Sequence, residues 1–220
     1  MSTDPIDRLL AQNKTWVASA TAKDPQFFER LAHGQTPEYL FIGCSDSRVP
    51  ANALTGTGPG EMFVHRNIAN QFHLHDLNSL AVVQYAVDVL DVSSIIVVGH
   101  YGCGGVKAAN GLHSYGLVDH WLGEIRDLGE RYQALLGTGE EERHHRLVEL
   151  SVLQQVVNLS LCPVLRTAWK KGRRPTLAGL VYDVADGALH KLVSGLSSVE
   201  QAQAVMPDPK AKVLPKLFKD

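Results

Sequence analysis

The sequence is poor in cysteine, with three in 220 residues, and this odd, small number argues against a disulfide framework. Basic side chains are not in excess either, because 21 Lys and Arg stand against 23 Asp and Glu. Nucleic-acid binding, which needs surplus cations, is therefore disfavoured. An apolar run of about 20 residues, as a membrane span requires, is missing, and the start does not resemble a signal peptide. We therefore expect a cytoplasmic protein that binds neither nucleic acid nor a membrane.

No internal repeat and no linker rich in Gly or Ser divides the chain, and 45% apolar with 20% charged residues is an ordinary globular composition. We interpret residues 1–220 as a single domain, with a helical arm over 1–34 and an irregular tail over 196–220. The arm is expected to hold two helices, because Asp4-Pro5 and Asp24-Pro25 each place a capping acid before a proline. We hypothesise that these N-terminal helices pack on a partner subunit.

Short apolar runs alternate with helical periodicity along the rest of the chain. Residues 94–98 are the clearest strand, since the run is unbroken and β-branched, as in a strand that is buried on both faces. The order of elements predicts an α/β fold, with a mostly parallel sheet flanked by helices and an antiparallel edge strand. The further strands are expected at 39–43, 61–65, 177–184 and 188–193, and the helices at 77–90, 118–136, 140–159 and 163–171.

Two of the predicted strands end in residues that bind metals. Cys44 follows the first strand, and the strand at 94–98 leads to His100 and Cys103. Because the carboxyl ends of parallel strands lie at one edge of a sheet, these side chains are expected to meet. Two cysteines and one histidine form a set that catalytic zinc sites use while they keep a fourth position open. Thiolate and imidazole ligands favour zinc over magnesium or calcium.

Asp46 and Arg48 follow Cys44 at alternate positions, so that an extended segment places all three on one side. The carboxylate of Asp46 can take the fourth position on the metal or hold a zinc-bound water. The guanidinium of Arg48 can fork onto that carboxylate, which fixes its orientation and keeps it ionised.

The motifs Cys44-Ser-Asp-Ser-Arg48 and Gly99-His-Tyr-Gly-Cys-Gly-Gly105 resemble the signature pair of the β-class carbonic anhydrases, as found in bacteria. The resemblance extends over about residues 5–195. It implies a lyase, carbonate dehydratase, that reversibly hydrates carbon dioxide to bicarbonate and a proton. It also implies one zinc ion per subunit, with Cys44, His100 and Cys103 as permanent ligands. Similar segments lie at 64–67, 83–89, 168–172 and 181–182.

The resemblance gives Asp46 and Arg48 a gating role. Asp46 would be a fourth zinc ligand in a closed state and a hydrogen-bond partner of zinc-bound hydroxide in an open state, with Arg48 pulling it off the metal. Low activity below about neutral pH, rising as hydroxide displaces Asp46, is then expected. The family also implies a homodimer, or a tetramer that is a dimer of dimers, with active sites near the subunit interface.

Some bacterial members bind bicarbonate at a second, non-catalytic site that contains a Trp, an Arg and a Tyr. Arg66 and Tyr182 match this site, whereas Phe41 stands at the Trp position. Phe keeps the aromatic bulk but lacks the indole N–H donor. Weaker bicarbonate binding at this position, or none, is therefore expected.

The remaining conspicuous side chains have simpler interpretations. His73, His75, His144 and His145 are expected to be surface histidines, one of which could relay protons. Cys162 is expected to be a small packed residue.

Two alternatives to the anhydrase remain open. The same zinc could hydrolyse another small linear molecule, such as carbon disulfide. A zinc-bound but inactive homologue could instead serve as a bicarbonate sensor or an interaction protein, although intact Asp46 and Arg48 argue against it. Redox chemistry at Cys44 or Cys103 is less favoured, because metal ligation would occupy both thiolates.

Overall fold

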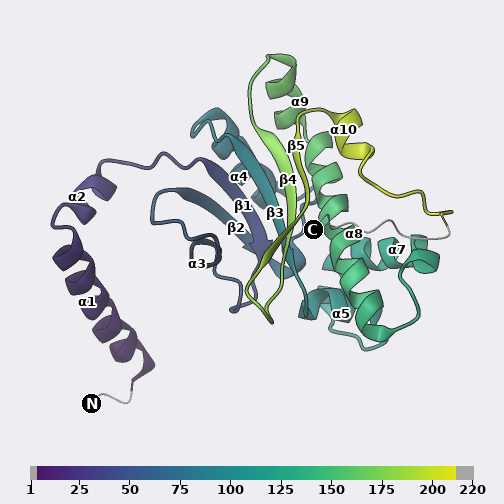
Figure 1. Ribbon diagram of the computed structural model, residues 1–220, viewed down its shortest axis with the longest axis horizontal. Helices are drawn as coiled ribbons and strands as arrows, with labels where there is room; N and C mark the ends of the chain where they lie inside the picture. The colour runs from purple at the N-terminus through teal and green to yellow at the C-terminus, as the bar shows by residue number, and fades with distance from the viewer. Residues whose placement is uncertain (1–3, 212–220) are drawn as a thin grey trace. The chain divides into compact units, whose positions relative to one another are not determined.

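The computed structural model describes residues 4–211, and the chain divides into two compact units, Met1–Thr36 and Pro37–Asp220 (Figure 1). The first unit contains α1 (Pro5–Lys23) and α2 (Phe27–Ala32). Asp4 caps α1, as predicted, by accepting the Ile6 N–H at 2.8 Å. Asp24 instead accepts the Gln26 N–H, and α2 begins one residue later, at Phe27. None of the residues in either helix is buried.

The second unit is built on a five-stranded sheet with the strand order β2-β1-β3-β4-β5 (Figure 1). The first four strands are parallel, and β5 pairs with β4 in the antiparallel direction. The predicted α/β fold, with a mostly parallel sheet and an antiparallel edge strand, is therefore confirmed. The strands are β1 (Tyr39–Cys44), β2 (Met62–Asn67), β3 (Ser94–His100), β4 (Thr176–Tyr182) and β5 (Leu189–Leu196).

Helices connect and flank these strands, and two predictions about them are wrong. The single helix expected over 118–136 is divided, because Leu122 (ψ 0°) ends one segment and Tyr132 (ψ 16°) ends the next. The tail is not wholly irregular, since Ser198 caps a short helix by accepting the Gln201 N–H at 3.2 Å and Ala202 is buried. The helices are α3 (Ala51–Thr55), η1 (Ile68–Asn70), α4 (Leu77–Asp88), α5 (Gly104–Asn110), α6 (Leu117–Trp121), α7 (Gly123–Arg131), η2 (Gln133–Leu135), α8 (Glu140–Leu161), α9 (Pro163–Lys170) and α10 (Val199–Gln203).

The main core lies where α8 packs on β3 and β4. Glycine lets the helix and sheet approach closely, because a Cβ atom at Gly99 would lie 2.5 Å from Val152 Cγ2, and one at Gly179 would lie 2.9 Å from Val152 Cγ1. A smaller apolar cluster contains Phe41 and Val98. No single helix in the described part of the chain is long and apolar enough to span a membrane. Within residues 4–211, only α8 and α9 together, across a bend of 62°, reach that length and composition.

Candidate metal centre

Cys44, His100 and Cys103 meet at the carboxyl edge of the sheet, as the strand ends predict. Cys44 ends β1, His100 ends the neighbouring strand β3, and Cys103 follows in the turn before α5. Their ligand atoms lie within 4.8 Å of one another, and the two Sγ atoms are 3.9 Å apart. The three residues are only 5%, 0% and 1% exposed. Two sulfurs bound to a tetrahedral zinc ion at about 2.3 Å would lie about 3.8 Å apart, so the observed spacing fits that ion.

The ring of His100 is oriented for metal binding. Its Nδ1 lies 3.0 Å from the carbonyl oxygen of Tyr101, and donation to that oxygen leaves the lone pair on Nε2 free. This Nε2 is buried and has no hydrogen-bond partner among residues 4–211. A buried nitrogen acceptor without a partner costs free energy, and a metal ion between it and two sulfurs would satisfy it.

Backbone N–H groups surround both sulfurs. The N–H groups of Asp46 and Ala69 near Cys44, and those of Gly105 and Val106 near Cys103, act to lower the pKa of the adjacent thiol. The contact with the Cys103 thiol lowers the pKa of Cys44, and the same contact, with burial, raises the pKa of Cys103. The donors therefore stabilise negative charge on sulfur, which is the form that binds a metal ion.

Asp46 and Arg48 form the predicted fork beside this cluster. Arg48 donates from Nε to Asp46 Oδ1 at 2.9 Å and from Nη2 to Oδ2 at 2.8 Å, and its backbone N–H also reaches Oδ1. A further bond from Nη2 to the carbonyl oxygen of Gly102, at 3.3 Å, connects the pair to the turn that carries Cys103. The hydrogen bonds from Arg48 hold the pKa of Asp46 well below its usual range, so the carboxylate is ionised at neutral pH. Asp46 Oδ2 lies 3.9 Å from His100 Nε2.

The three residues matched to a bicarbonate site, Phe41, Arg66 and Tyr182, lie on β1, β2 and β4, respectively. Phe41 is fully buried in the smaller apolar cluster, and Tyr182 packs against that cluster. Arg66 donates from Nε to the carbonyl oxygen of Cys44 at 2.8 Å and from Nη2 to that of Asp46 at 2.5 Å. Its guanidinium is therefore bound to the backbone of the Cys44–Asp46 segment, and the weak or absent bicarbonate binding expected there stays a prediction.

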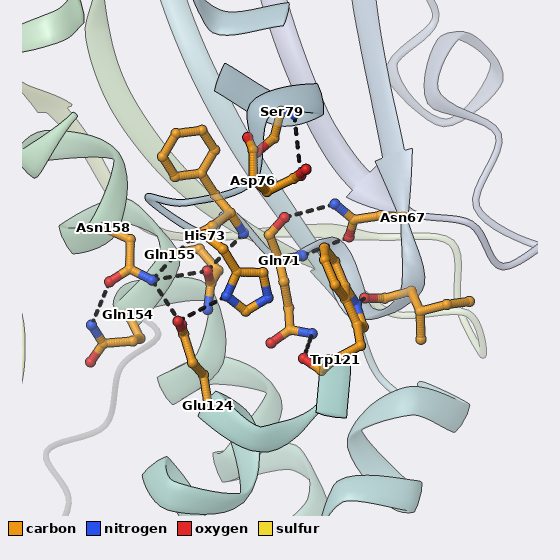
Figure 2. A network of polar contacts seen from close by, with 12 residues as sticks. Asn67, Gln71, His73, Asp76, Ser79, Trp121, Glu124, Gln154, Gln155 and Asn158 are labelled. Carbon is orange, nitrogen blue, oxygen red and sulfur yellow. Dashed lines mark hydrogen bonds and ion pairs between the residues drawn. The ribbon is translucent and has the colours of Figure 1, made fainter. Parts of the chain in front are cut away.

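Two of the four histidines predicted on the surface are buried. His73 lies against Trp121, with its Nδ1 2.8 Å from Glu124 Oε1 (Figure 2). His144 is on the inner face of α8, where burial, helped by the charge of Lys107, lowers its pKa to about 4. His75 is exposed as predicted, and His145 is partly buried. The sequence does not indicate the burial of His73 or His144, because a single histidine leaves the apolar periodicity around it ambiguous.

The prediction for the third cysteine is confirmed, because Cys162 is fully buried in the main core. A second group of metal-binding residue types occurs where β4 turns into β5. It consists of Asp183, Asp186 and His190, whose ligand atoms lie within 4.8 Å of one another. Asp183 accepts the Ala185 N–H at 2.8 Å, and Asp186 accepts the Ala188 N–H at 2.8 Å. These bonds give both carboxylates a role in the turn itself.

Known proteins resemble this chain in both sequence and fold. The model of the carbonic anhydrase family matches residues 39–189, a range that contains all the candidate site residues. A carbonic anhydrase of Emericella nidulans is 45% identical over 188 residues, which cover 84% of this chain and 82% of that relative. A carbonic anhydrase of Pseudomonas aeruginosa is 36% identical, over 84% of this chain and 89% of the relative. The β-carbonic anhydrase of Coccomyxa, solved with acetazolamide, superimposes with a TM-score of 0.88 at 34% identity, covering 94% of this chain and 95% of the other.

The chain belongs to the β-class carbonic anhydrase family. The resemblance drawn from the two sequence motifs is thereby confirmed. This β-carbonic anhydrase is an enzyme, and the reaction of its family is the reversible hydration of carbon dioxide to bicarbonate.

Proposed function

We propose that this carbonic anhydrase holds one Zn²⁺ per subunit between Cys44, His100 and Cys103, and that Asp46 and Arg48 direct the reaction beside it. The observation that carries the proposal is the buried pair of sulfurs 3.9 Å apart next to the unpartnered Nε2 of His100. Bound zinc supplies a Lewis acid that brings the pKa of water toward neutrality. Magnesium and calcium prefer sites made of oxygen donors, so a site made of two thiolates and an imidazole favours zinc.

Asp46 orients the attacking water in this mechanism. Its carboxylate, ionised and fixed by the two bonds from Arg48, accepts a hydrogen bond from the water and directs a lone pair of the water oxygen at the carbon of carbon dioxide. Arg48 restricts the rotation of the carboxylate, so the acceptor oxygen keeps one position. The proton released by each hydration passes to solvent or buffer. When Asp46 leaves Arg48 it can become a fourth metal ligand, which is the proposed closed state.

The assembly is proposed to be a homodimer or a dimer of dimers. The first unit supports this, because its helices bury no residue, and the apolar side chains of Ile6, Leu9 and Leu10 are 59%, 60% and 56% exposed. Two β-carbonic anhydrases of Sordaria macrospora are tetrameric, and one solved chain is 35% identical, with a TM-score of 0.81 over 86% of this chain and 98% of the other. Light scattering of the full chain should give a dimer or tetramer, and Leu9→Glu with Leu10→Glu should reduce that mass. A monomer at micromolar concentration would contradict the proposal.

The cytoplasmic location stays a prediction.

The function is tested by stopped-flow hydration of carbon dioxide on protein whose zinc content has been measured. We expect close to one zinc per chain and rapid hydration, both lost in Cys44→Ser, because serine does not replace a thiolate ligand. Cys162→Ser is the matched control, since Cys162 is buried away from the cluster, in the core beside α9, and it should keep its zinc. Stoichiometric zinc without hydration at any pH would overturn the proposed mechanism and favour a sensor or another substrate.

A further inference from the structure

A strained turn lies directly beside the metal cluster. In η1, Ala69 has φ 60° and ψ 32°, and Asn70 has φ 47°. This left-handed conformation costs free energy for alanine and less for asparagine, and two such residues in succession need surroundings that enforce them. The turn follows Asn67, which pairs with Cys44 in the register of β1 and β2, and η1 packs against β1. It is therefore part of the surroundings of a proposed ligand atom.

The side chain of Asn67 closes this turn from one end to the other (Figure 2). Its Oδ1 accepts the backbone N–H of Gln71 at 2.8 Å, and its Nδ2 donates to the Gln71 carbonyl oxygen at 2.7 Å. The carbonyl oxygen of Asn67 accepts the Ser45 N–H at 2.9 Å, next to Cys44. One residue thus holds both ends of the strained turn and connects it to the strand end that carries the sulfur.

Trp121 supports the same turn from α6. Its Nε1 donates to the Ile68 carbonyl oxygen at 2.8 Å, and its carbonyl oxygen accepts from Gln71 Nε2 at 2.9 Å (Figure 2). On the other side, a Cβ atom at Gly105 would lie 2.9 Å from Ile68 Cγ2 and 3.0 Å from the Cβ of Ala69. The turn is therefore enclosed between Asn67, α6 and the start of α5, and it has little room to relax.

We propose that Asn67 is a positioning residue of this enzyme, which holds the Ala69–Asn70 turn and the strand end at Cys44 in one arrangement, so that the backbone around the Cys44 sulfur stays in place. A hydrogen bond to a thiolate withdraws charge from the sulfur and fixes its position, and groups of this kind tune both metal affinity and metal acidity. The inference rests on the proposed zinc function. It adds a determinant of the site that touches neither substrate nor metal.

The test compares Asn67→Ala with the wild-type full chain. Zinc affinity is measured by competition with a chromophoric chelator, and the thiolate-to-metal charge-transfer band is recorded after substitution with Co²⁺. We expect zinc affinity to fall by about 10-fold, the band to shift, and the pH profile of hydration to move to higher pH. Asn158→Ala is the matched control, because Asn158 belongs to the same polar network but binds Phe72 and Glu124 rather than the turn. It should leave the zinc affinity within about twofold of wild type.

A double variant separates positioning from general destabilisation. Glycine adopts the left-handed conformation without the cost that alanine pays, so Asn67→Ala with Ala69→Gly should regain part of the zinc affinity and return the cobalt band toward wild type. Asn67→Ala with unchanged zinc affinity and an unchanged cobalt band would overturn the inference. So would a loss of the same size in Asn158→Ala. If the wild type itself binds no zinc, the proposed function fails first, and the two failures are thereby distinguished.

Discussion

The proposed metal ligands and the Asp46–Arg48 pair lie next to each other, but they are held in different ways. The three ligands are almost completely buried, and the ends of β1 and β3 and several backbone N–H groups fix them. The side chains of Asp46 and Arg48 are 18% and 53% exposed, and they are held mainly by each other. Exposed ion pairs contribute little net free energy because water competes for both partners. The fold thus fixes the ligands, whereas the pair can separate at low cost, as a gate requires.

Removing the metal should have the largest effect, because it acts on the buried half of the site. Protein treated with a chelator should lose hydration to the uncatalysed rate and should regain it with one equivalent of zinc. Its thermal midpoint should fall as well, since the donors of Cys44, His100 and Cys103 would lose their common partner. Stopped-flow rates and thermal unfolding of the apo and reconstituted forms check both effects. Full activity in metal-free protein would refute the ligand assignment.

Arg48→Ala should have the next largest effect, and it should act on activity rather than on metal content. Without the fork, Asp46 loses its fixed orientation, and the hydration rate should fall by about 10- to 100-fold. The hydration rate of Arg48→Lys should lie between those of the wild type and Arg48→Ala, because lysine keeps the charge but cannot make the two parallel hydrogen bonds. The kcat for hydration is measured together with bound zinc. Loss of zinc in parallel with activity would mean that the exposed pair also holds the metal.

The pH should affect the hydration rate without affecting the charge of the Asp46–Arg48 pair. Arg48 lowers the pKa of Asp46, so the stability that this pair contributes is present above the ordinary carboxyl pKa of about 4 and is lost only as the pH falls through the lowered value. Across about pH 6.5 to 9 Asp46 therefore stays ionised and the fold is unaffected. Hydration should nevertheless rise with pH in this window, by up to about tenfold per unit, as the attacking water becomes deprotonated and displaces Asp46 from the metal. A flat rate profile in stopped-flow measurements would exclude the gate.

The same contrast explains which features could be predicted from the sequence. Strand ends are visible in the apolar pattern, so the meeting of Cys44 with His100 and the fork between Asp46 and Arg48 could both be inferred from chain order. The left-handed turn at Ala69 could not, because alanine does not mark that conformation and Asn70 only permits it, and because the turn depends on the close approach of Gly105 in α5 and on Trp121 in α6. The short helix after Ser198 has a visible cap, but its stability comes from burying Ala202, which only the tertiary structure reveals.

The smallest predicted effect concerns how closely α5 approaches the metal cluster, and two adjacent glycines provide the comparison. A Cβ atom at Gly104 would meet no atom within 4 Å, whereas one at Gly105 would press on Ile68 and Ala69. Gly104→Ala should therefore stabilise the enzyme by about 0.5–1 kcal/mol through helix propensity. Gly105→Ala should cost about 1–3 kcal/mol and weaken zinc binding a few-fold, because it displaces the turn that packs beside Cys44. Denaturant unfolding and chelator competition measure the two variants side by side. Equal behaviour of both would show that the positions of the buried ligands do not depend on this close approach.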